Sequence, residues 1–402
     1  MLRAGRIMPR PSPFYSRTAA LCESHSWQEW SGFLSANMYE LHHLREYYAI
    51  RTAAALIDIS PLYKYLVHGR DALKLLNRVM TRDIARCAVG QVLYTPWCDE
   101  HGRIIDDGTV TQLAPGRYRV TAADPSLRWF EDNATGLQVQ IDDISDSLAA
   151  LALQGPLAGE ILQQAAGPAL AQLKYFRHAS AAIAGMDVSI TRTGYTGDLG
   201  YELFADPADA ERLWDALMEA GQPRLLRAAG QLALDMVRIE AGLLLVAVDF
   251  ISSKKTVFDV QKSTPYELGL GWTVMLEKGN FVGRAALAAE RERGAAWATV
   301  GLDVQWDSLE QIYKRYGMPI HLPETAWGNA VPVYSDEVQI GRATSGTWSP
   351  LLKKYVVLAR IQPQYAKPGT PVCMEATVEA QRHMTAARVT ALPFYNPPHK
   401  RA

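Results

Sequence analysis

The chain has few cysteines, no long apolar run and almost no net charge. Four cysteines occur in 402 residues, and no two of them stand at the Cys-x-x-Cys spacing of metal sites, so we predict reduced thiols and no metal centre. No uninterrupted apolar run approaches the ~20 residues of a membrane span, so we predict no membrane partner. The formal net charge of -1 argues against electrostatic binding of nucleic acid.

The composition is otherwise that of an ordinary globular protein. Hydrophobic residues make up 48% and charged residues 21%, and the length suggests two or three domains. Residues 1–22 contain four arginines and no acid, which resembles a transit peptide, but the prolines at 9, 11 and 13 oppose an amphipathic helix. We therefore expect a disordered basic leader and, since no secretory apolar segment is visible, a cytoplasmic protein.

Periodicity and turn residues predict a mixture of helices and strands up to residue 294. We expect a helix over 39–57, a strand over 63–68 and a helix over 72–80 that Asp71 caps. A hairpin is expected over 91–114, with its turn near His101 and Gly102. The remaining predicted elements are a helix that starts at Gly155-Pro156 after an apolar run over 147–153, strands over 117–122, 188–192 and 201–204, and helices over 125–133, 208–220, 228–240 and 281–293.

The pattern changes after Gly294. Regularly spaced short strands are typical of a small β-barrel or sandwich. We therefore place a domain boundary near 294–297 and a C-terminal β domain over 298–395. Its predicted strands cover 298–304, 330–334, 338–343, 355–360, 372–376 and 386–392.

Two adjacent carboxylates, Asp106 and Asp107, follow an apolar strand. A hairpin turn is the simple interpretation, because Asp-Gly is a common turn dipeptide. The turn is already supplied by Gly102, however, and Tyr94 is expected on the paired strand, where its ring can pack against a flat ligand. A buried carboxylate can bind the N–H donors of a planar ring and orient an amine, so the pair is a candidate site.

The segment 194–202, Gly-Tyr-Thr-Gly-Asp-Leu-Gly-Tyr-Glu, holds three glycines in seven residues. It is not a phosphate-binding loop, because no lysine follows and no helix is expected there. Glycines at this density either form an ordinary hairpin loop or let the backbone approach a ligand closely. Glu202 is accordingly either a surface residue or an acceptor for a ligand amino group, and the residues alone leave both interpretations open.

Three further features of the second half of the chain have simple interpretations. Arg238 and Glu240 are two residues apart on a predicted helix, so we expect both to be solvated. The segment 249–255 is predicted to be a loop at the edge of a site or a surface turn. Trp348 is expected in a turn that ends a strand, from which it could cover a ligand.

Taken in order, these motifs resemble those of the glycine-cleavage T-protein (aminomethyltransferase) family. The resemblance runs along nearly the whole chain, and it implies an α+β fold with three domains in a ring around a central folate channel and a C-terminal β-barrel. The implied domains are a leader with the first strands over 1–38, a folate-binding region of two intertwined α+β domains over 39–294, and the barrel over 298–395. Besides the two motifs above, the matching segments are 46–51, 58–60, 154–156, 238–242, 281–287 and 344–350.

The resemblance also implies a tetrahydrofolate site. Asp106 takes the place of the family's catalytic aspartate. Tyr94, Tyr195 and Glu202 take the places of residues that contact the pterin ring. These four residues are the centre of the predicted site.

Two further residues are candidates for cofactor binding. They are Trp348 and Arg388, the latter because it lies near the position of a basic residue that meets the folate tail. For the catalytic pair, we expect Asp106→Asn to remove most turnover. Asp107→Asn should cost less, because alternate residues of a strand face opposite sides.

Departures from the family's pattern leave the one-carbon donor open. Leu234 stands where a folate-site arginine is expected, and Val110 stands where a tyrosine follows the aspartate pair. These apolar residues resemble those of relatives that demethylate small molecules, so we predict methyl or methylene transfer from a small-molecule donor to tetrahydrofolate. The alternative is aminomethyl transfer from a lipoyl carrier protein with release of ammonia. A second alternative is a non-catalytic folate-binding regulatory protein, against which the presence of Asp106 argues.

Overall fold

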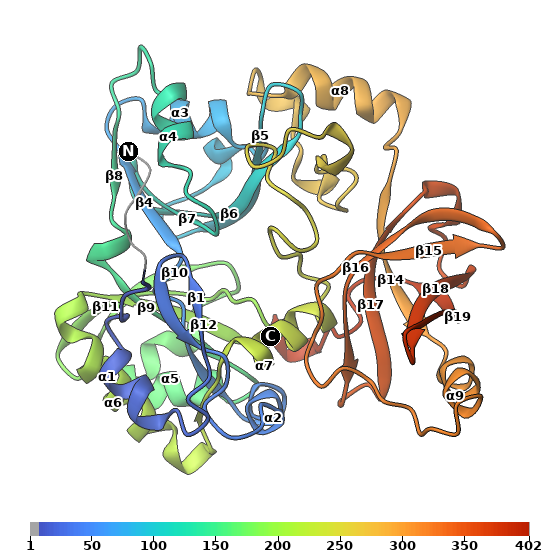
Figure 1. The fold of residues 1–402 in the computed structure, drawn as a ribbon. Coiled ribbons are helices and arrows are strands. Elements are labelled where there is room, and N and C mark those ends of the chain that lie inside the picture. The colour runs from blue at the N-terminus through green and yellow to red at the C-terminus, as the bar shows by residue number, and fades with distance from the viewer. Residues whose placement is uncertain (1–7, 402) are drawn as a thin grey trace. The chain divides into compact units, whose positions relative to one another are not determined.

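The computed structural model describes residues 8–401, and these form two compact units. Of the described residues, unit 1 contains 8–95, 106–234 and 397–401, and unit 2 contains 96–105 and 235–396. Each unit combines helices with strands (Figure 1). The last few residues of the chain therefore belong to the same unit as the first.

Unit 1 is built on two β-sheets. The first has six strands in the order β10-β11-β12-β9-β3-β13, antiparallel except for the pair of β3 and β13. Helices α5 (Ala158–Ala166) and α6 (Ala210–Gly221) cover one face and share an apolar core with it. The strands are β3 (Ala55–Asp58), β9 (Ala149–Gln154), β10 (His178–Ile183), β11 (Met186–Thr191), β12 (Gly200–Ala205) and β13 (Arg227–Ala228).

The second sheet of unit 1 has five strands in the order β5-β6-β7-β4-β8. Helices α3 (Ala72–Val79) and α4 (Leu127–Asn133) accompany it, and the ring of Phe130 in α4 lies edge-on against Tyr65 in β4, with ring centroids 5.5 Å apart. One face of this sheet is therefore covered by helix. The strands are β4 (Tyr63–His68), β5 (Val92–Cys98), β6 (Ile104–Ala114), β7 (Arg117–Ala122) and β8 (Gln140–Asp143).

The expectation of a disordered leader over residues 1–22 is wrong for the part that the structure describes. Residues 15–21 form helix α1 (Tyr15–Leu21), and Phe14 is fully buried in the core beneath α6. Arg17 forms ion pairs with Glu211 and Asp215. The segment is thus held by burial and by charge, and strands β1 (Trp27–Trp30) and β2 (Phe33–Ala36) follow it. Residues 1–7 lie outside the described residues.

The predicted helix over 39–57 is too long. Helix α2 (Leu44–Thr52) is followed by β3, which lies between β9 and β13 in the sheet. The apolar residues that extended the helical pattern are therefore strand residues, buried on both faces of a central strand. Asp71 precedes α3 as predicted, but its carboxylate accepts from the backbone N–H of Gln138 and not from the helix.

Unit 2 is centred on a closed barrel of six strands, ordered β14-β17-β16-β15-β18-β19 (Figure 1). The predicted C-terminal barrel is thereby confirmed, and its apolar interior is one contiguous core. Helices α8 (Arg284–Arg293) and α9 (Trp306–Lys314) belong to the same unit, and α7 (Gln231–Glu240) begins in unit 1 and ends in unit 2. The strands are β14 (Ala298–Val304), β15 (Val331–Ser335), β16 (Val338–Ser349), β17 (Lys354–Ile361), β18 (Pro371–Val378) and β19 (Gln381–Thr390).

Most other predicted elements are present within a few residues of their expected ends. Strand β10 and helix α9 were not predicted, and β16 runs six residues beyond its expected end, from 343 to 349. Trp348 consequently lies inside a strand, where the expectation of a terminating turn is wrong. The three-domain division and the ring arrangement stay predictions.

Among residues 8–401, no helix has both the length and the apolarity needed to cross a membrane. The four cysteines are all free thiols, and Cys98 is fully buried. Burial raises the pKa of the Cys98 thiol well above its ordinary value, which disfavours the nucleophilic thiolate.

Candidate functional site

Strand β6 presents its two carboxylates on opposite faces of the second sheet. Its register pairs Val110 with Val120 and Thr111 with Arg119 on β7. Even-numbered residues of β6 before the register shift at 112–114 therefore share the face of Val120, and β4 places Tyr65 on that same face, against α4. Odd-numbered residues share the opposite face with Arg119.

Asp106 lies on the helix-covered face. It is completely buried, and its Oδ2 accepts a hydrogen bond of 2.8 Å from the backbone N–H of Asp124. Its Oδ1 is buried and has no hydrogen-bond partner among the described residues. Burial, followed by the charge of Asp107, raises the pKa of Asp106 well above its ordinary value.

Asp107 lies on the opposite face and is only partly buried. Its Oδ2 accepts a hydrogen bond of 2.7 Å from the hydroxyl of Tyr94. Burial raises the pKa of Asp107 to about 6, although the bond from Tyr94 opposes the shift. The pKa of Tyr94 is also raised, chiefly by burial and then by Asp107, with a smaller contribution from Tyr195. Tyr94, Asp107 and Tyr195 therefore share one environment.

This arrangement favours Asp107 over Asp106 as the carboxylate that a ligand can reach. The prediction assigned contact to Asp106 and the smaller effect to Asp107, and this order stays a prediction. The greater exposure of Asp107 is the reason to test the reverse order. Thr109 and Thr111 alternate with Val110 in the sequence and mark the same polar face. The catalytic role of Asp106 itself stays a prediction.

Glu202 lies on the face of the first sheet that is opposite to its helices. It pairs with Thr191 on β11, whereas the neighbouring pair of Ile190 and Leu203 belongs to the helix-covered core. Its Oε2 accepts from the hydroxyls of Thr193 at 2.8 Å and Thr191 at 3.4 Å. Among the described residues no hydrogen bond reaches Oε1 of Glu202, so this oxygen can accept from a ligand.

The glycines of segment 194–202 are required by a close contact inside unit 1. A Cβ on either Gly194 or Gly200 would overlap the side-chain amide of Gln154. That amide donates to the Thr193 carbonyl at 3.2 Å and accepts from the Thr196 hydroxyl at 2.8 Å. The glycines thus admit Gln154, which fixes the loop that carries Tyr195.

The two sheets contact each other through Arg119 of β7 and Ser189 of β11. We call the polar side chains on these facing surfaces the polar layer, and its residues are Tyr94, Asp107, Arg119, Lys64, Ser189 and Glu202. Arg119 of β7 donates to the Ser189 hydroxyl of β11 at 3.0 Å, and its guanidinium lies 3.6 Å from the ring centroid of Phe204. The pKa of Arg119 falls to about 10 because of burial. Burial likewise lowers the pKa of Lys64 to about 7. Sequence reasoning did not select either cation.

Trp348 and Arg388 belong to unit 2, whereas the residues of the polar layer belong to unit 1. Trp348 packs against Trp306 of α9, with ring centroids 5.3 Å apart. Arg388 is exposed on β19, and its guanidinium is 3.5 Å from the carbonyl oxygen of Gly369. Their roles in cofactor binding stay predictions.

Unit 2 contains a buried polar network that the sequence did not indicate. Arg238 and Glu240, which were expected to be solvated, are 1% and 0% exposed. Arg238 forms an ion pair with Asp249, whose carboxylate also accepts from the hydroxyls of Thr344 and Ser345. The segments 238–242, 249–255 and 344–350 are thus held together by one network.

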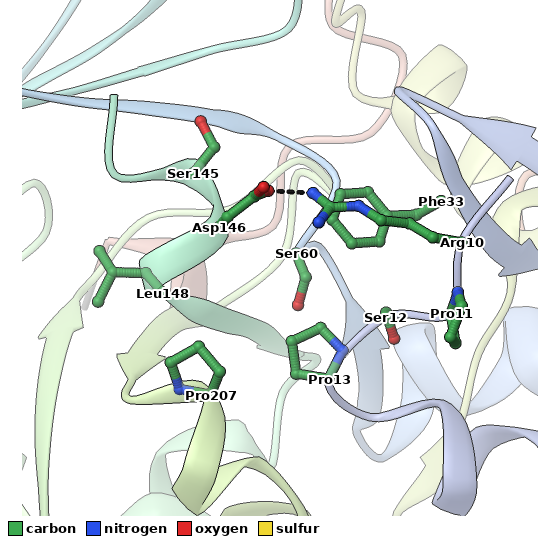
Figure 2. A pocket seen from close by; sticks show the side chains of 10 residues that line it. All are labelled: Arg10, Pro11, Ser12, Pro13, Phe33, Ser60, Ser145, Asp146, Leu148 and Pro207. Carbon is green, nitrogen blue, oxygen red and sulfur yellow. Dashed lines mark hydrogen bonds and ion pairs between the residues drawn. The ribbon is translucent and has the colours of Figure 1, made fainter. Parts of the chain in front are cut away.

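A cavity of about 240 Å³ lies elsewhere in unit 1 (Figure 2). Arg10, Phe33 and Asp146 line this cavity. The Arg10 guanidinium forms an ion pair with Asp146 and lies 4.0 Å from the ring centroid of Phe33. None of the predicted site residues lines this cavity. Its remaining lining residues are Pro11, Ser12, Pro13, Ser60, Ser145, Leu148 and Pro207.

Comparison with known proteins identifies related sequences and one closely similar fold. The model of the GCVT N-terminal domain matches residues 14–278, and that of the glycine cleavage T-protein C-terminal barrel domain matches 317–396. An aminomethyltransferase of Halothermothrix orenii is 33% identical over 380 residues, covering 94% of this chain and 96% of that protein. The aminomethyltransferase T of the glycine cleavage system from Bartonella henselae superimposes with a TM-score of 0.81 at 26% identity, covering 96% of this chain and 98% of that one.

A relative with a different name is equally similar in sequence. The trimethylamine-oxide aldolase of Ruegeria pomeroyi is 34% identical over 406 residues, covering 97% of this chain. The alignment covers 47% of that protein, so the chain spans about half of its length.

Proposed function

Since the chain belongs to the glycine-cleavage T-protein (GCVT) family of one-carbon transferases, we propose that it binds tetrahydrofolate in the polar layer and transfers an aminomethyl-derived one-carbon unit to it. The observation that supports this most is the placement of Asp107 with Tyr94 on one sheet and Glu202 on the other. Acceptors on two facing walls suit a flat heterocycle that carries N–H donors on its edges.

The residues present suit the reduced pterin. The free Oε1 of Glu202 can accept from the ring's amino and amide N–H groups, and Asp107 can accept from the reacting amine. Tyr94 and Tyr195 offer aromatic surface beside the ring. Bound tetrahydrofolate supplies the secondary amine that accepts the one-carbon unit.

Asp107 is the group that we assign to contact with the reacting amine. Its pKa of about 6 lies near neutrality, so the carboxyl group can exchange a proton with a ligand at physiological pH. The hydroxyl of Tyr94 holds the carboxylate in position. Asp106 lies behind the strand, where burial and then the charge of Asp107 raise its pKa well above its ordinary value.

The comparisons support an aminomethyl donor on a lipoyl carrier protein more than the small-molecule donor that the sequence suggested. The structure weakens one reason for preferring a small-molecule donor, namely the apolar residue at position 110. Val110 lies on the helix-covered face with Val120, so it does not border the polar layer. Leu234 is also buried.

A small-molecule donor remains the second candidate. It is supported by the similarity to the trimethylamine-oxide aldolase and by Leu234 at a position where the family resemblance leads one to expect arginine. A methylated amine or its N-oxide is the donor class to test.

Binding and donor choice need separate experiments. Calorimetric titration with tetrahydrofolate should show binding, and no heat at millimolar ligand would contradict the proposal. A reconstituted assay with aminomethylated lipoyl carrier protein should then release ammonia and form 5,10-methylenetetrahydrofolate. Turnover with trimethylamine N-oxide and none with the carrier protein would favour the second candidate.

A further inference from the structure

Arg119 is a buried cation whose hydrogen-bonding capacity is largely unused. Only 3% of the residue is exposed, and one nitrogen, Nη1, donates to Ser189. Its Nε and Nη2 are buried without a partner among the described residues. A buried donor without a partner is unfavourable by about 1–3 kcal/mol, so two on one side chain require an explanation.

Arg119 contacts Ser189 and Phe204, and Glu202 lies two residues before Phe204 on the same face of β12. The side chains of Arg119 and Glu202 attract one another, since Glu202 raises the pKa of Arg119 and Arg119 lowers that of Glu202. No hydrogen bond or ion pair joins them in the described part of the structure, although both lie in the polar layer. Phe204 supports the guanidinium from one side and fixes its plane. The layer therefore presents fixed donors next to a fixed acceptor.

A pterin ring carries the complementary pattern on one edge. Its 2-amino and N3–H groups are donors, and the adjacent 4-oxo group is an acceptor. We propose that Arg119 donates to the 4-oxo group of the pterin while Glu202 accepts from the neighbouring N–H groups, which makes Arg119 a determinant of ligand specificity. This inference rests on the proposed function, because it assumes that the pterin occupies the polar layer.

The two ligands that test the contact differ in the substituent at C4, and the neutral 4-amino ring also lacks the N3–H donor of the 4-oxo ring. Tetrahydrofolate has the 4-oxo group, and 4-amino-4-deoxytetrahydrofolate has an amino group that would face the Arg119 donors. Calorimetric affinities of both ligands should be measured for the wild-type protein and for Arg119→Met, which keeps the apolar stem over Phe204. Arg117→Met is the matched control, because Arg117 is exposed on the same strand.

We expect wild-type protein to prefer the 4-oxo ligand. Arg119→Met should weaken tetrahydrofolate binding by about tenfold to hundredfold, since hydrogen bonds from charged groups are worth that much. It should change the affinity for the 4-amino ligand little, so the preference should shrink to the part that the N3–H contact with Glu202 contributes. Arg117→Met should leave both affinities unchanged, and Arg119→Lys should restore part of the preference because it keeps a cationic donor.

The opposite outcomes are distinct. Equal tetrahydrofolate affinity in wild type and Arg119→Met would show that Arg119 only supports the sheets, and an equal loss for both ligands would place its contact away from the 4-oxo group. Either result overturns the inference and leaves the proposed function standing. If the wild-type protein binds neither ligand, the proposed function itself fails. If Arg119→Met does not fold, the same comparison made with Arg119→Leu, which also lacks the donors, decides the question.

Discussion

Two buried arginines in this protein differ in how fully they are paired. Arg238 in unit 2 donates to Asp235, Asp249, Ser345 and the Leu243 carbonyl. Arg119 in unit 1 is also buried, but among residues 8–401 its side chain donates only to Ser189. Arg238 has the partners that offset the cost of burying a charge. Arg119 has two buried donor nitrogens, Nε and Nη2, without a partner among the described residues. The incomplete pairing of Arg119 is the observation on which the proposed ligand contact in unit 1 rests.

The largest expected effect concerns the carboxylate of the polar layer. Asp107→Asn should lower turnover by about 10²- to 10⁴-fold, because the amide cannot accept a proton from the reacting amine. Asp106→Asn should lower it less, since Asp106 faces the helices. Steady-state rates of 5,10-methylenetetrahydrofolate formation measure both variants. A larger loss in Asp106→Asn would restore the assignment made from the sequence.

The paired arginine should matter most for stability. Arg238→Met leaves Asp249 buried without its cation, so we expect the free energy of unfolding to fall by about 3–5 kcal/mol. Arg119→Met should lower it by less than about 2 kcal/mol, since a single hydrogen bond is lost. Urea denaturation followed by tryptophan fluorescence compares the two. Equal losses would show that both arginines are structural.

Asp107 should make stability depend on pH in a definite direction. Its pKa in the folded protein is about 6, above the ordinary value of 3.8, so the folded state binds the proton more tightly than the unfolded state. The contribution of Asp107 to the free energy of unfolding is therefore highest below about pH 4, and it falls by about 3 kcal/mol as the pH rises through 6.

The variant Asp107→Asn isolates this contribution. It should be more stable than wild type at pH 7.5, and the difference should vanish near pH 4, where the wild-type carboxyl group is protonated in the folded protein. Denaturation curves at the two pH values test this. A variant that is less stable than wild type at pH 7.5 would contradict the raised pKa.

The smallest expected effect tests the packing of the glycine-rich segment. Gly200→Ala should lower the free energy of unfolding by about 1–3 kcal/mol, because the new Cβ overlaps the Gln154 amide. The double variant that combines Gly200→Ala with Gln154→Ala should lose less free energy of unfolding than the two single variants lose together. Gly159→Ala is the control, since Gly159 lies in helix α5 with ordinary contact distances, where alanine should be neutral or stabilising. Thermal or urea denaturation measures all of them.

Much of the fold could be predicted because its elements are strongly patterned. Alternating residues predicted β4, the strand over 117–122 is present as β7, and the short strands separated by turns predicted the barrel. Central strands were harder, because β3 is apolar at consecutive positions and was included in a helix. Burial of Arg238 and Glu240 was missed, since their partners are contributed by segments distant in the sequence.

The sequence by itself determined the candidate residues of the site, because Tyr94, Asp106, Tyr195 and Glu202 stand in motifs that can be recognised without a structure. Only the tertiary structure decided which way each one points. A strand turns neighbouring side chains to opposite faces, and the packing of α4 on one face leaves the other, with Asp107, for the polar layer. Arg119 became a candidate in the same way, because its unused donors are visible only once both sheets are in place.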